Sequence, residues 1–367
     1  MILLAVVAIV GAYQVLALAA CVVRRGQGSA RNGRKPREAG SQYPVSILKP
    51  IRGLDPAFRE AIRSHTVLQG DNEVLCGVSN LNDPAVGVLR EFPSVRVIEC
   101  HTKARNGKVG VLIDLAAAAR YPTLVVNDSD IRVEPDYLRR VTAPLLDPRV
   151  GLVTCLYRPV GDTFEARFEG LGISTDFAPS TLVARLVGVD EFAMGSTLAF
   201  RRADLERIGG FAAIADYLAD DYQLGHRIHA LGLKCVLSDV IVETHLQGGW
   251  RDVWAHQVRW ARTIRVTKVF GYLGLPVTNA TLWAVIAAAC GRWDLAAALL
   301  AVRMVMAFAA GWFMMRSRDV VRLSWLIPSR DLFGFAVWLA GLFGNSVVWR
   351  GEYMRLGRQG RIGFEQE

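Results

Sequence analysis

The sequence predicts an α/β domain with a mainly parallel sheet, flanked by membrane-spanning helices toward both ends of the chain. Two patterns lead to this class. Uncharged apolar stretches lie near both ends of the 367 residues, and between them short apolar runs alternate with helical segments. With 52% hydrophobic and 21% charged residues, the chain is too apolar for an ordinary soluble domain and is not a disordered chain.

The N-terminal apolar stretch covers residues 1–23, contains no charged residue and is long enough to cross a bilayer. Arg24 and Arg25 follow at once, and four more basic residues come before residue 38. Positive charge on this side of a span places the following domain in the cytoplasm. Residues 24–44 are rich in Gly, Arg and Ser, which predicts a basic linker attracted to anionic lipid.

Three more apolar stretches, each of spanning length, predict a transmembrane region over 271–350 with about three spans. They cover 269–291, 295–315 and 332–349. Arg303 interrupts the second stretch; we expect it to face a helix partner or to reach the interface, and a functional role is the alternative. Four spans in total leave the basic tail 351–367 outside, against the positive-inside rule, so a re-entrant C-terminal segment is the alternative.

Residues 45–248 alternate strand and helix, which predicts a mainly parallel sheet with helices on both faces. Ligands of such sheets gather at the carboxyl ends of the strands. No dinucleotide or P-loop glycine motif is present. The predicted strands cover 45–48, 73–78, 95–99, 123–126 and 194–200, and the predicted helices 56–69, 83–92, 109–120, 135–146, 164–186 and 214–231. A helix rich in Trp and Arg, over 249–270, is expected to lie in the membrane interface.

The first candidate site is Asp128-Ser129-Asp130, which follows the apolar strand 123–126 after Asn127. Two carboxylates one residue apart present oxygens to one Mg²⁺ or Mn²⁺, an ion that takes its other ligands from substrate phosphates. Such an ion neutralises charge that builds up on a leaving nucleoside diphosphate. A turn cap is the alternative, because Asp and Ser are common at turns.

The second candidate is the pair Asp220 and Asp221. A carboxylate at the mouth of a site takes the proton from an attacking hydroxyl. The alternative is a solvated pair at a helix start, which the helix dipole favours.

The third candidate group lies on the predicted helix 249–270. His256 and Arg259 are three residues apart and therefore share a face. Arg259 has the geometry to pair with a phosphate, and Trp260 offers a platform for a sugar or a lipid. The alternative is a helix that is amphipathic only because it lies in the interface.

Three further residues have a functional and a plain interpretation. Asp83 precedes Pro84 and caps a helix in the plain interpretation. Lys49 and Lys108 are either phosphate contacts or ordinary surface charges.

Taken in order, these pieces resemble the family-2 and family-21 type glycosyltransferases of the GT-A fold. More narrowly, the chain resembles ceramide glucosyltransferases and their bacterial relatives, including the hopanoid-associated glycosyltransferases. The resemblance covers about residues 45–270. It is carried by Val45 to Pro50, Gly53 to Pro56, Asp83-Pro84-Ala85, Asp128 to Val133, Gly151-Leu152-Val153, Asp220-Asp221-Tyr222 and Arg259-Trp260.

The resemblance implies a role for each matching position. Asp83 and Lys108 would contact the nucleotide sugar, and Asp128 and Asp130 would hold the diphosphate and its metal. Asp221 would be the general base. Arg259 and Trp260 would close over the diphosphate and the acceptor entrance. His256, also placed among the nucleotide-sugar contacts, stands where the family has Gln or Arg, which leaves the role of that position open.

The implied reaction is an inverting transfer from a UDP-sugar to a lipid hydroxyl, with Mg²⁺ or Mn²⁺ as cofactor. The acceptor is ceramide or a polyol hopanoid and the sugar glucose or N-acetylglucosamine, and the sequence does not choose between them. The expected partners are the donor, the lipid and the bilayer, with no nucleic acid. The protein is expected in the inner membrane of a bacterium, with its catalytic domain in the cytoplasm.

Three other functions remain as alternatives. A polyisoprenyl-phosphate glycosyltransferase needs no base because its acceptor is already anionic, and a polysaccharide synthase needs more spans to build a channel. A membrane scaffold that binds sugar nucleotides without catalysis is the third possibility, although every motif carboxylate is present.

Overall fold

The computed structural model describes residues 1–32, 43–55 and 57–363, and it divides into two compact units. The sheet unit takes its described residues from 34–157 and 189–245. The helical unit takes its described residues from 1–33, 158–188 and 246–367. Each unit is described by itself.

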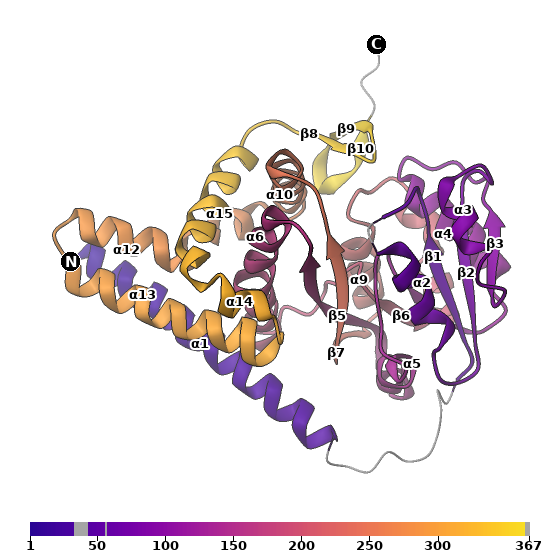
Figure 1. Cartoon of the computed structure of the whole chain (residues 1–367), viewed down its shortest axis with the longest axis horizontal. Helices are drawn as coiled ribbons and strands as arrows, with labels where there is room; N and C mark the ends of the chain where they lie inside the picture. Colours follow the sequence, from indigo (N-terminus) through magenta and orange to yellow (C-terminus); the bar gives the residue numbers. More distant parts are fainter. Residues whose placement is uncertain (33–42, 56, 364–367) are drawn as a thin grey trace. The chain divides into compact units, whose positions relative to one another are not determined.

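The sheet unit is built on a seven-stranded sheet with the strand order β3-β2-β1-β4-β6-β5-β7 (Figure 1). Neighbours among β3, β2, β1 and β4 are parallel, whereas β6 runs antiparallel to both β4 and β5. Every residue of β4 and all but the last of β1 are buried, as expected for strands covered on both faces. The strands are β1 (Val45–Pro50), β2 (Asn72–Val78), β3 (Val95–Glu99), β4 (Thr123–Val126), β5 (Val150–Gly161), β6 (Leu198–Arg201) and β7 (Lys234–Leu246).

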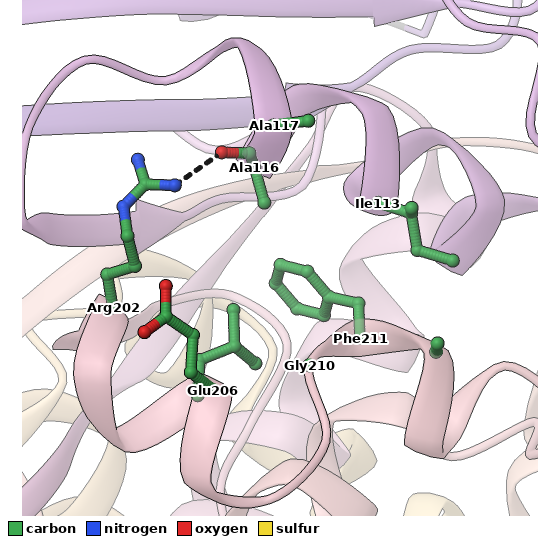
Figure 2. Close-up of a pocket in the computed structure, with 9 residues that line it drawn as sticks. Ile113, Ala116, Ala117, Arg202, Glu206, Gly210 and Phe211 are labelled. Carbon is green, nitrogen blue, oxygen red and sulfur yellow. Dashed lines mark hydrogen bonds between the residues drawn. The ribbon is translucent and has the colours of Figure 1, made fainter.

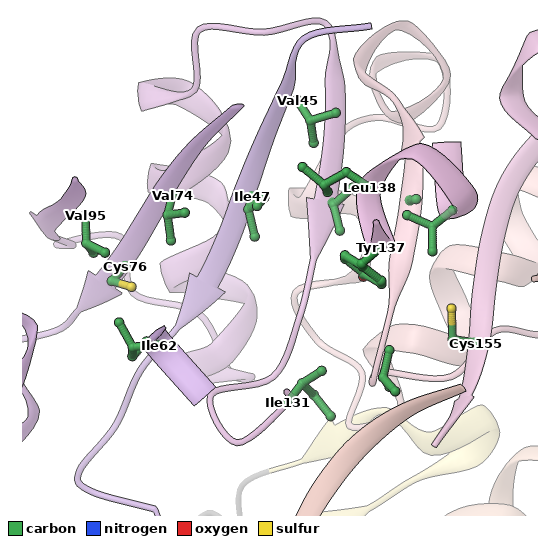
Figure 3. Close-up of a cluster of buried hydrophobic side chains, with 14 of the residues drawn as sticks. Val45, Ile47, Ile62, Val74, Cys76, Val95, Ile131, Tyr137, Leu138 and Cys155 are labelled. Carbon is green, nitrogen blue, oxygen red and sulfur yellow. The ribbon is translucent and has the colours of Figure 1, made fainter. Parts of the chain in front are cut away.

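Two hydrophobic clusters cover the two faces of this sheet. Val45 and Ile47 of β1 point to one cluster, and Leu48 points to the other, because successive side chains of a strand alternate. Figure 3 shows the first cluster, where Tyr137 and Leu138 pack against the strands. The helices of this unit are α2 (Phe58–Thr66), α3 (Pro84–Leu89), α4 (Gly107–Ala118), α5 (Tyr137–Thr142), η1 (Ala143–Leu146), α8 (Arg202–Arg207), η3 (Phe211–Ile214) and α9 (Asp220–Ala230).

The predicted parallel strands are confirmed to within a few residues, but β5 and β7 were not predicted. These two strands are 12 and 13 residues long and stand at one side of the sheet. Polar residues such as Thr154 and Ser238 interrupt their apolar runs, so neither sequence shows the continuous pattern of the central strands.

The helical unit holds two helices that are long and apolar enough to cross a membrane, Ile2–Gly26 and Trp293–Met314. A third segment of this kind is broken, because Val269–Thr278 and Ala280–Ala289 meet at an angle of 55°. Helices α1, α12 and α13 share a core that includes Val7, Ala284 and Leu299 (Figure 1). The helices are α1 (Ile2–Asn32), α6 (Phe164–Gly172), η2 (Ile173–Phe177), α7 (Ala178–Leu186), α10 (Trp250–Thr267), α11 (Val269–Gly274), η4 (Leu275–Thr278), α12 (Ala280–Ala289), α13 (Trp293–Phe308), η5 (Ala309–Met314), α14 (Arg318–Arg322), η6 (Ser324–Leu326) and α15 (Ile327–Gly341).

The span expected over 332–349 and the tail expected over 351–367 differ from the structure. Helix α15 ends at Gly341, and the chain then forms a small three-stranded sheet of β8 (Ser346–Trp349), β9 (Glu352–Leu356) and β10 (Ile362–Gly363). Arg350 and Gly351 both have positive φ, 52° and 82°, which matches a two-residue hairpin turn. The short turn element η7 (Arg358–Gly360) precedes β10.

Two other boundaries differ from the expectation. Helix α1 runs on to Asn32, so the first part of the expected linker 24–44 is helical, and residues 33–42 lie outside the described part. Arg25 donates a hydrogen bond of 2.6 Å to the carbonyl of Phe313, which favours the helical extension. Residues 158–188, expected within the domain 45–248, group with the helical unit, and a π-helical turn interrupts the predicted helix 164–186.

Arg303 faces a helix partner, as expected. Its guanidinium donates to both carboxylate oxygens of Asp331 on α15, at 2.6 and 2.9 Å, and also to the carbonyl of Thr175 at 2.9 Å. Only 4% of the Arg303 side chain is exposed, so the pair satisfies a charge that would otherwise be costly to bury.

Glu73 ties three strands of the sheet unit together. Its carboxylate accepts from the hydroxyl of Ser46 at 2.6 Å, from Arg96 at 2.7 Å, and from the backbone and side chain of Arg120 at 2.6 and 2.9 Å. Burial works to raise the pKa of Glu73, but these hydrogen bonds outweigh it and hold the pKa below its usual range.

We predict that Glu73→Gln lowers the stability of the sheet unit by about 1–3 kcal/mol, because the buried carboxylate that accepts from Ser46, Arg96 and Arg120 is replaced by a neutral amide. The effect should be full above about pH 4.3, the pKa of an unfolded Glu, and should fade as the pH falls further, through the lower pKa of Glu73 in the folded state. All nine tryptophans lie in the helical unit, so urea unfolding should be followed by thiol labelling of the buried Cys76 and Cys155. Glu60→Gln, at an exposed position of α2, is the control; equal midpoints for the two variants would contradict the assignment.

Candidate catalytic site

Four chain segments bring a cluster of charged side chains together beyond the carboxyl end of β4. The cluster contains Lys108 from α4, Asp128 from the end of β4, and Asp220 and Asp221 from the start of α9. Gly195 closes it: a Cβ at this position would lie 3.2 Å from Asp128 Oδ2, 3.4 Å from Asp221 Oδ2 and 3.6 Å from Lys108 Nζ. A side chain at 195 would therefore crowd the space between the charges.

Lys108 is the central cation of this cluster. Its Nζ lies 2.7 Å from Asp128 Oδ1 and 3.2 Å from Asp220 Oδ2, and 13% of its side chain is exposed. Burial works to lower the pKa of Lys108, but Asp128 and Asp220 reverse this and raise it, so the ammonium stays charged. Asn106 fixes its position, because it caps α4 and donates to the carbonyl of Tyr217 just before α9.

Asp221 is held by backbone groups. Its Oδ2 accepts from the amide of Gly195 at 2.8 Å, and its Oδ1 accepts from the amide of Tyr222 at 2.7 Å. Burial, and next the charge of Asp220, raise the pKa of Asp221 to about 6. A carboxylate with such a pKa is ionised at neutral pH and is still basic enough to accept a proton from a hydroxyl.

Asp130 points to other partners. It accepts a short hydrogen bond from the hydroxyl of Thr244, while Ser129 donates to Asp55. Burial, and next the charge of Asp128, raise the pKa of Asp130. The backbone of Arg132 exchanges two hydrogen bonds with Glu243, of 2.9 and 3.0 Å, which brings Thr244 to this carboxylate.

A buried polar network around Asn127 holds the chain just before Asp128 in place. The side-chain amide of Asn127 donates to Tyr137 at 2.9 Å, to the carbonyl of Ser196 at 2.7 Å and to Thr197 at 3.2 Å. His65 contacts the Asn127 oxygen at 3.4 Å, and burial lowers the pKa of this histidine to about 3, so it is neutral. The network fixes the direction in which the chain leaves β4.

Lys49 is not a surface charge, in contrast to the plain interpretation of the sequence. It is fully buried and donates a hydrogen bond of 2.8 Å to the carbonyl of Asp128. Burial lowers the pKa of Lys49 to about 8, and the neighbouring carboxylates only partly offset this. Lys49 therefore places a second positive group under the Asp128 to Asp130 segment.

Asp128 and Asp130 are the residues that could hold a divalent cation. Among the described residues, no group of three or more His, Cys, Asp or Glu side chains forms a metal site. The side chain of Asp128 is 38% exposed, and Asp130 has a raised pKa beside it, so a cation would relieve repulsion between the two. These residues fit an ion that takes its remaining ligands from phosphate oxygens.

Asp83 stands apart from the charged cluster and caps α3. Its Oδ1 accepts from the amide of Ala85 at 2.9 Å, and its Oδ2 accepts from the amide of Gly53 at 2.8 Å. The plain interpretation of Asp83 as a helix cap is confirmed. The bond to Gly53 also fixes the loop that follows β1.

His256, Arg259 and Trp260 lie on α10 of the helical unit. His256 Nδ1 is 2.7 Å from Glu169 Oε1, and the side-chain amide of Gln257 donates to the same oxygen at 2.7 Å. Glu169 is buried, with 2% of its side chain exposed. The ring of Trp260 packs edge-on against His256, with the centroids 4.5 Å apart.

A shallow apolar hollow of about 220 Å³ lies elsewhere in the sheet unit, beside α4, α8 and η3. Figure 2 shows Ile113 and Phe211 in its wall, and Arg202, which donates to the carbonyl of Ala116 at 2.7 Å. Arg202 also binds the carbonyl of Ala119 and so satisfies the end of α4. The hollow contains none of the residues that the sequence pointed to.

Sequence reasoning brought Lys108, Asp128 and Asp221 to one place but missed several groups that hold them. Gly195, Thr244 and Asn127 were not singled out. Asn127 directly precedes the acidic pair, and this adjacency was the available signal. Gly195 and Thr244 have no such signal. Gly195 lies just before β6, which pairs antiparallel with the distant β4, and Thr244 is brought in by the bridge between Arg132 and Glu243.

Comparison with known proteins finds relatives of the kind that the sequence motifs resemble. Two ceramide glucosyltransferases of Caenorhabditis elegans, numbers 1 and 3, are each 28% identical to the chain, over 204 and 214 residues. These matches cover 53% and 56% of this chain and 44% and 46% of the relatives, so the chain matches less than half the length of these relatives.

Among solved structures, a mannosyltransferase from Pyrobaculum calidifontis, in complex with GDP-Man and Mn²⁺, has a TM-score of 0.51 and 20% sequence identity. The superposition covers 92% of this chain and 99% of that one, which shows a shared GT-A fold. The family model described as glycosyl transferase family 21 matches residues 2–362. This protein is therefore a glycosyltransferase that belongs to family 21.

Proposed function

We propose that this protein transfers a sugar from a UDP-sugar to the hydroxyl of a membrane lipid, with inversion at the anomeric carbon. The observation that carries the proposal is the half-buried carboxylate of Asp221 beside the Lys108–Asp128 pair. A base with a pKa of about 6 is suited to a neutral hydroxyl acceptor.

The reaction follows from this arrangement. Asp221 takes the proton of the lipid hydroxyl as its oxygen attacks the anomeric carbon. The bond between that carbon and the diphosphate oxygen breaks, and UDP leaves with the electron pair. A single displacement inverts the configuration, so an α-linked donor gives a β-glycoside.

The charge of the site supports a divalent cation as cofactor. Four carboxylates, those of Asp128, Asp130, Asp220 and Asp221, share Lys49 and Lys108 as cations in the contacts described above. A diphosphate would meet an excess of negative charge at this place. Mg²⁺ or Mn²⁺ held by Asp128 and Asp130 would supply the missing positive charge, and Lys108 would orient Asp128.

The remaining predicted residues have proposed roles of their own. Asp83 with Gly53 would contact the nucleoside, while Arg259 and Trp260 would bind the diphosphate and the acceptor. His256, fixed by Glu169, would set the position of Trp260.

A lipid acceptor is supported by the two helices of spanning length in the same chain. It is also supported by the ceramide glucosyltransferases that share 28% identity. We propose ceramide or a hydroxylated hopanoid as acceptor, glucose or N-acetylglucosamine as sugar, and a catalytic domain on the cytoplasmic side of a bacterial inner membrane.

Asp221→Asn should lower kcat at least a hundredfold, because the amide keeps the hydrogen bond from Gly195 but cannot accept the proton. The measurement is transfer of tritiated sugar into the organic phase by solubilised enzyme. Asp216→Asn, at an exposed position before α9, should behave as wild type. Substantial activity of Asp221→Asn would instead favour a polyisoprenyl-phosphate acceptor, which needs no base.

The pH dependence of kcat/KM should show an acidic limb near pH 6, because only the ionised form of Asp221 accepts a proton. Below that pH the rate should fall tenfold per unit. Asp220→Asn removes the nearest like charge and should move the limb to lower pH. A rate that stays constant down to pH 4.5 would contradict this role for Asp221.

UDP binding should depend on Mn²⁺, and Asp128→Asn should raise the Mn²⁺ concentration for half-maximal UDP binding at least tenfold. Isothermal calorimetry with a Mn²⁺ series measures this. Asp136→Asn, on the surface before α5, is the matched control. Equal UDP affinity in EDTA and in Mn²⁺ would rule out the proposed metal site.

A further inference from the structure

The helical unit contains a cavity of about 110 Å³, and none of the proposed catalytic residues lines it. Four segments enclose it: the stretch from α6 to α7, η4 with Asn279, α13, and α15. Its volume holds several water molecules or the polar end of a lipid.

One wall of the cavity is charged. Asp176 is exposed there, whereas its neighbours Ser174 and Thr175 are buried. Arg330 is 7% exposed, and its Nε has no hydrogen-bond partner among the described residues. Arg303 also lines the wall, but Asp331 and Thr175 satisfy its guanidinium.

Arg330 is held in place rather than free to leave the wall. Its guanidinium lies over the rings of Phe168 and Phe333, at 5.9 and 5.4 Å from their centroids. Its Nη2 donates to the Gln257 side chain at 2.8 Å. Gly172 leaves room for it, because a Cβ there would lie 2.3 Å from the same nitrogen.

The other wall is apolar and includes Leu275, Phe335 and Trp338. Beside it, the broken apolar segment bends by 55° next to Asn279, which itself lines the cavity. Interrupted helices in membrane segments are tolerated where they are buried in protein or line a polar cavity, and such breaks mark ligand sites in other membrane proteins. The cavity is thus amphiphilic and lies within an apolar helical bundle.

We propose that this cavity binds the uncharged, hydroxyl-bearing headgroup of a lipid. Asp176 accepts a hydrogen bond from a hydroxyl, Arg330 donates one to an oxygen, and the aromatic wall packs against the first carbons of the chain. Two carboxylates and two guanidiniums give the wall no net charge, and Asp331 cancels Arg303. A phosphate would therefore gain little from Arg330 while facing Asp176, whereas a neutral lipid satisfies both.

Hydrogen bonds connect the cavity to the helix that carries Arg259 and Trp260. Arg330 binds Gln257, Gln257 binds Glu169, and Glu169 binds His256. The cavity wall and α10 therefore share one hydrogen-bond network. The assignment of the bound lipid as the sugar acceptor rests on the proposed function.

The test is binding of a fluorescent short-chain ceramide to the full chain in detergent micelles, followed by polarisation. Wild type should bind saturably, and Asp176→Leu should weaken binding at least tenfold. Asp294→Asn, at an exposed position on α13, is the control. UDP binding, measured on the same samples, should be unchanged in all variants and reports that they are folded.

A photoactivatable ceramide gives a second measurement that needs no variant. The crosslink should map to peptides containing residues 172–180 or 330–338. Unchanged ceramide affinity in Asp176→Leu, a crosslink elsewhere, tighter binding of a fluorescent polyisoprenyl phosphate, or absence of saturable binding by wild type would each overturn the inference. If wild type binds ceramide in the cavity yet transfers no sugar to any lipid, the inference stands and the proposed function fails.

Discussion

The concentration of carboxylates at the carboxyl end of β4 is the constraint on which the rest of the site depends. Asp128 and Asp130 leave the sheet one residue apart, and Asp220 and Asp221 arrive from the start of α9. Like charges this close repel one another, and burial makes the repulsion worse. The sheet unit balances them with Lys108, which bridges Asp128 and Asp220, and with the buried Lys49 below. The balance is incomplete: burial, and next the charge of Asp220, raise the pKa of Asp221 to about 6.

The fold holds this arrangement with groups that carry no charge. Because β1 and β4 pair in parallel, the carboxyl ends of both strands lie at the same edge of the sheet. Asn127, Tyr137 and Thr197 satisfy one another beneath that edge, and neutral His65 closes the network. Because every donor and acceptor there has a partner, the direction of Asp128 is fixed before any ligand binds. The amide of Gly195 does the same for Asp221.

The sequence was sufficient to predict the parallel half of the sheet and the acidic pair Asp128 and Asp130 at its edge, whereas Lys108 and Asp221 were assigned to the site through the resemblance to glycosyltransferases. Continuous apolar strands and acidic residues at their ends are local signals, and parallel strands must end at one edge. Strands β5 and β7 were not predicted because polar residues interrupt their apolar runs. Gly195 and Thr244 were not predicted as part of the site because pairing with distant segments, rather than any local pattern, brings them there. Near the C-terminus, hydropathy over 332–349 gave no sign that α15 ends at Gly341 and that a small sheet follows, with its first turn at Arg350-Gly351.

The helical unit buries polar groups inside an apolar bundle, and the paired Arg303 and Asp331 are among them. The most direct measurement of the central claim is incubation of the solubilised protein with Mn²⁺, a bacterial lipid extract with added ceramide, and tritiated UDP-glucose or UDP-N-acetylglucosamine. The account predicts label in the organic phase from one donor, as a β-glycoside of an uncharged lipid. UDP binding without any labelled lipid, or label found only on a phosphorylated lipid, would contradict it.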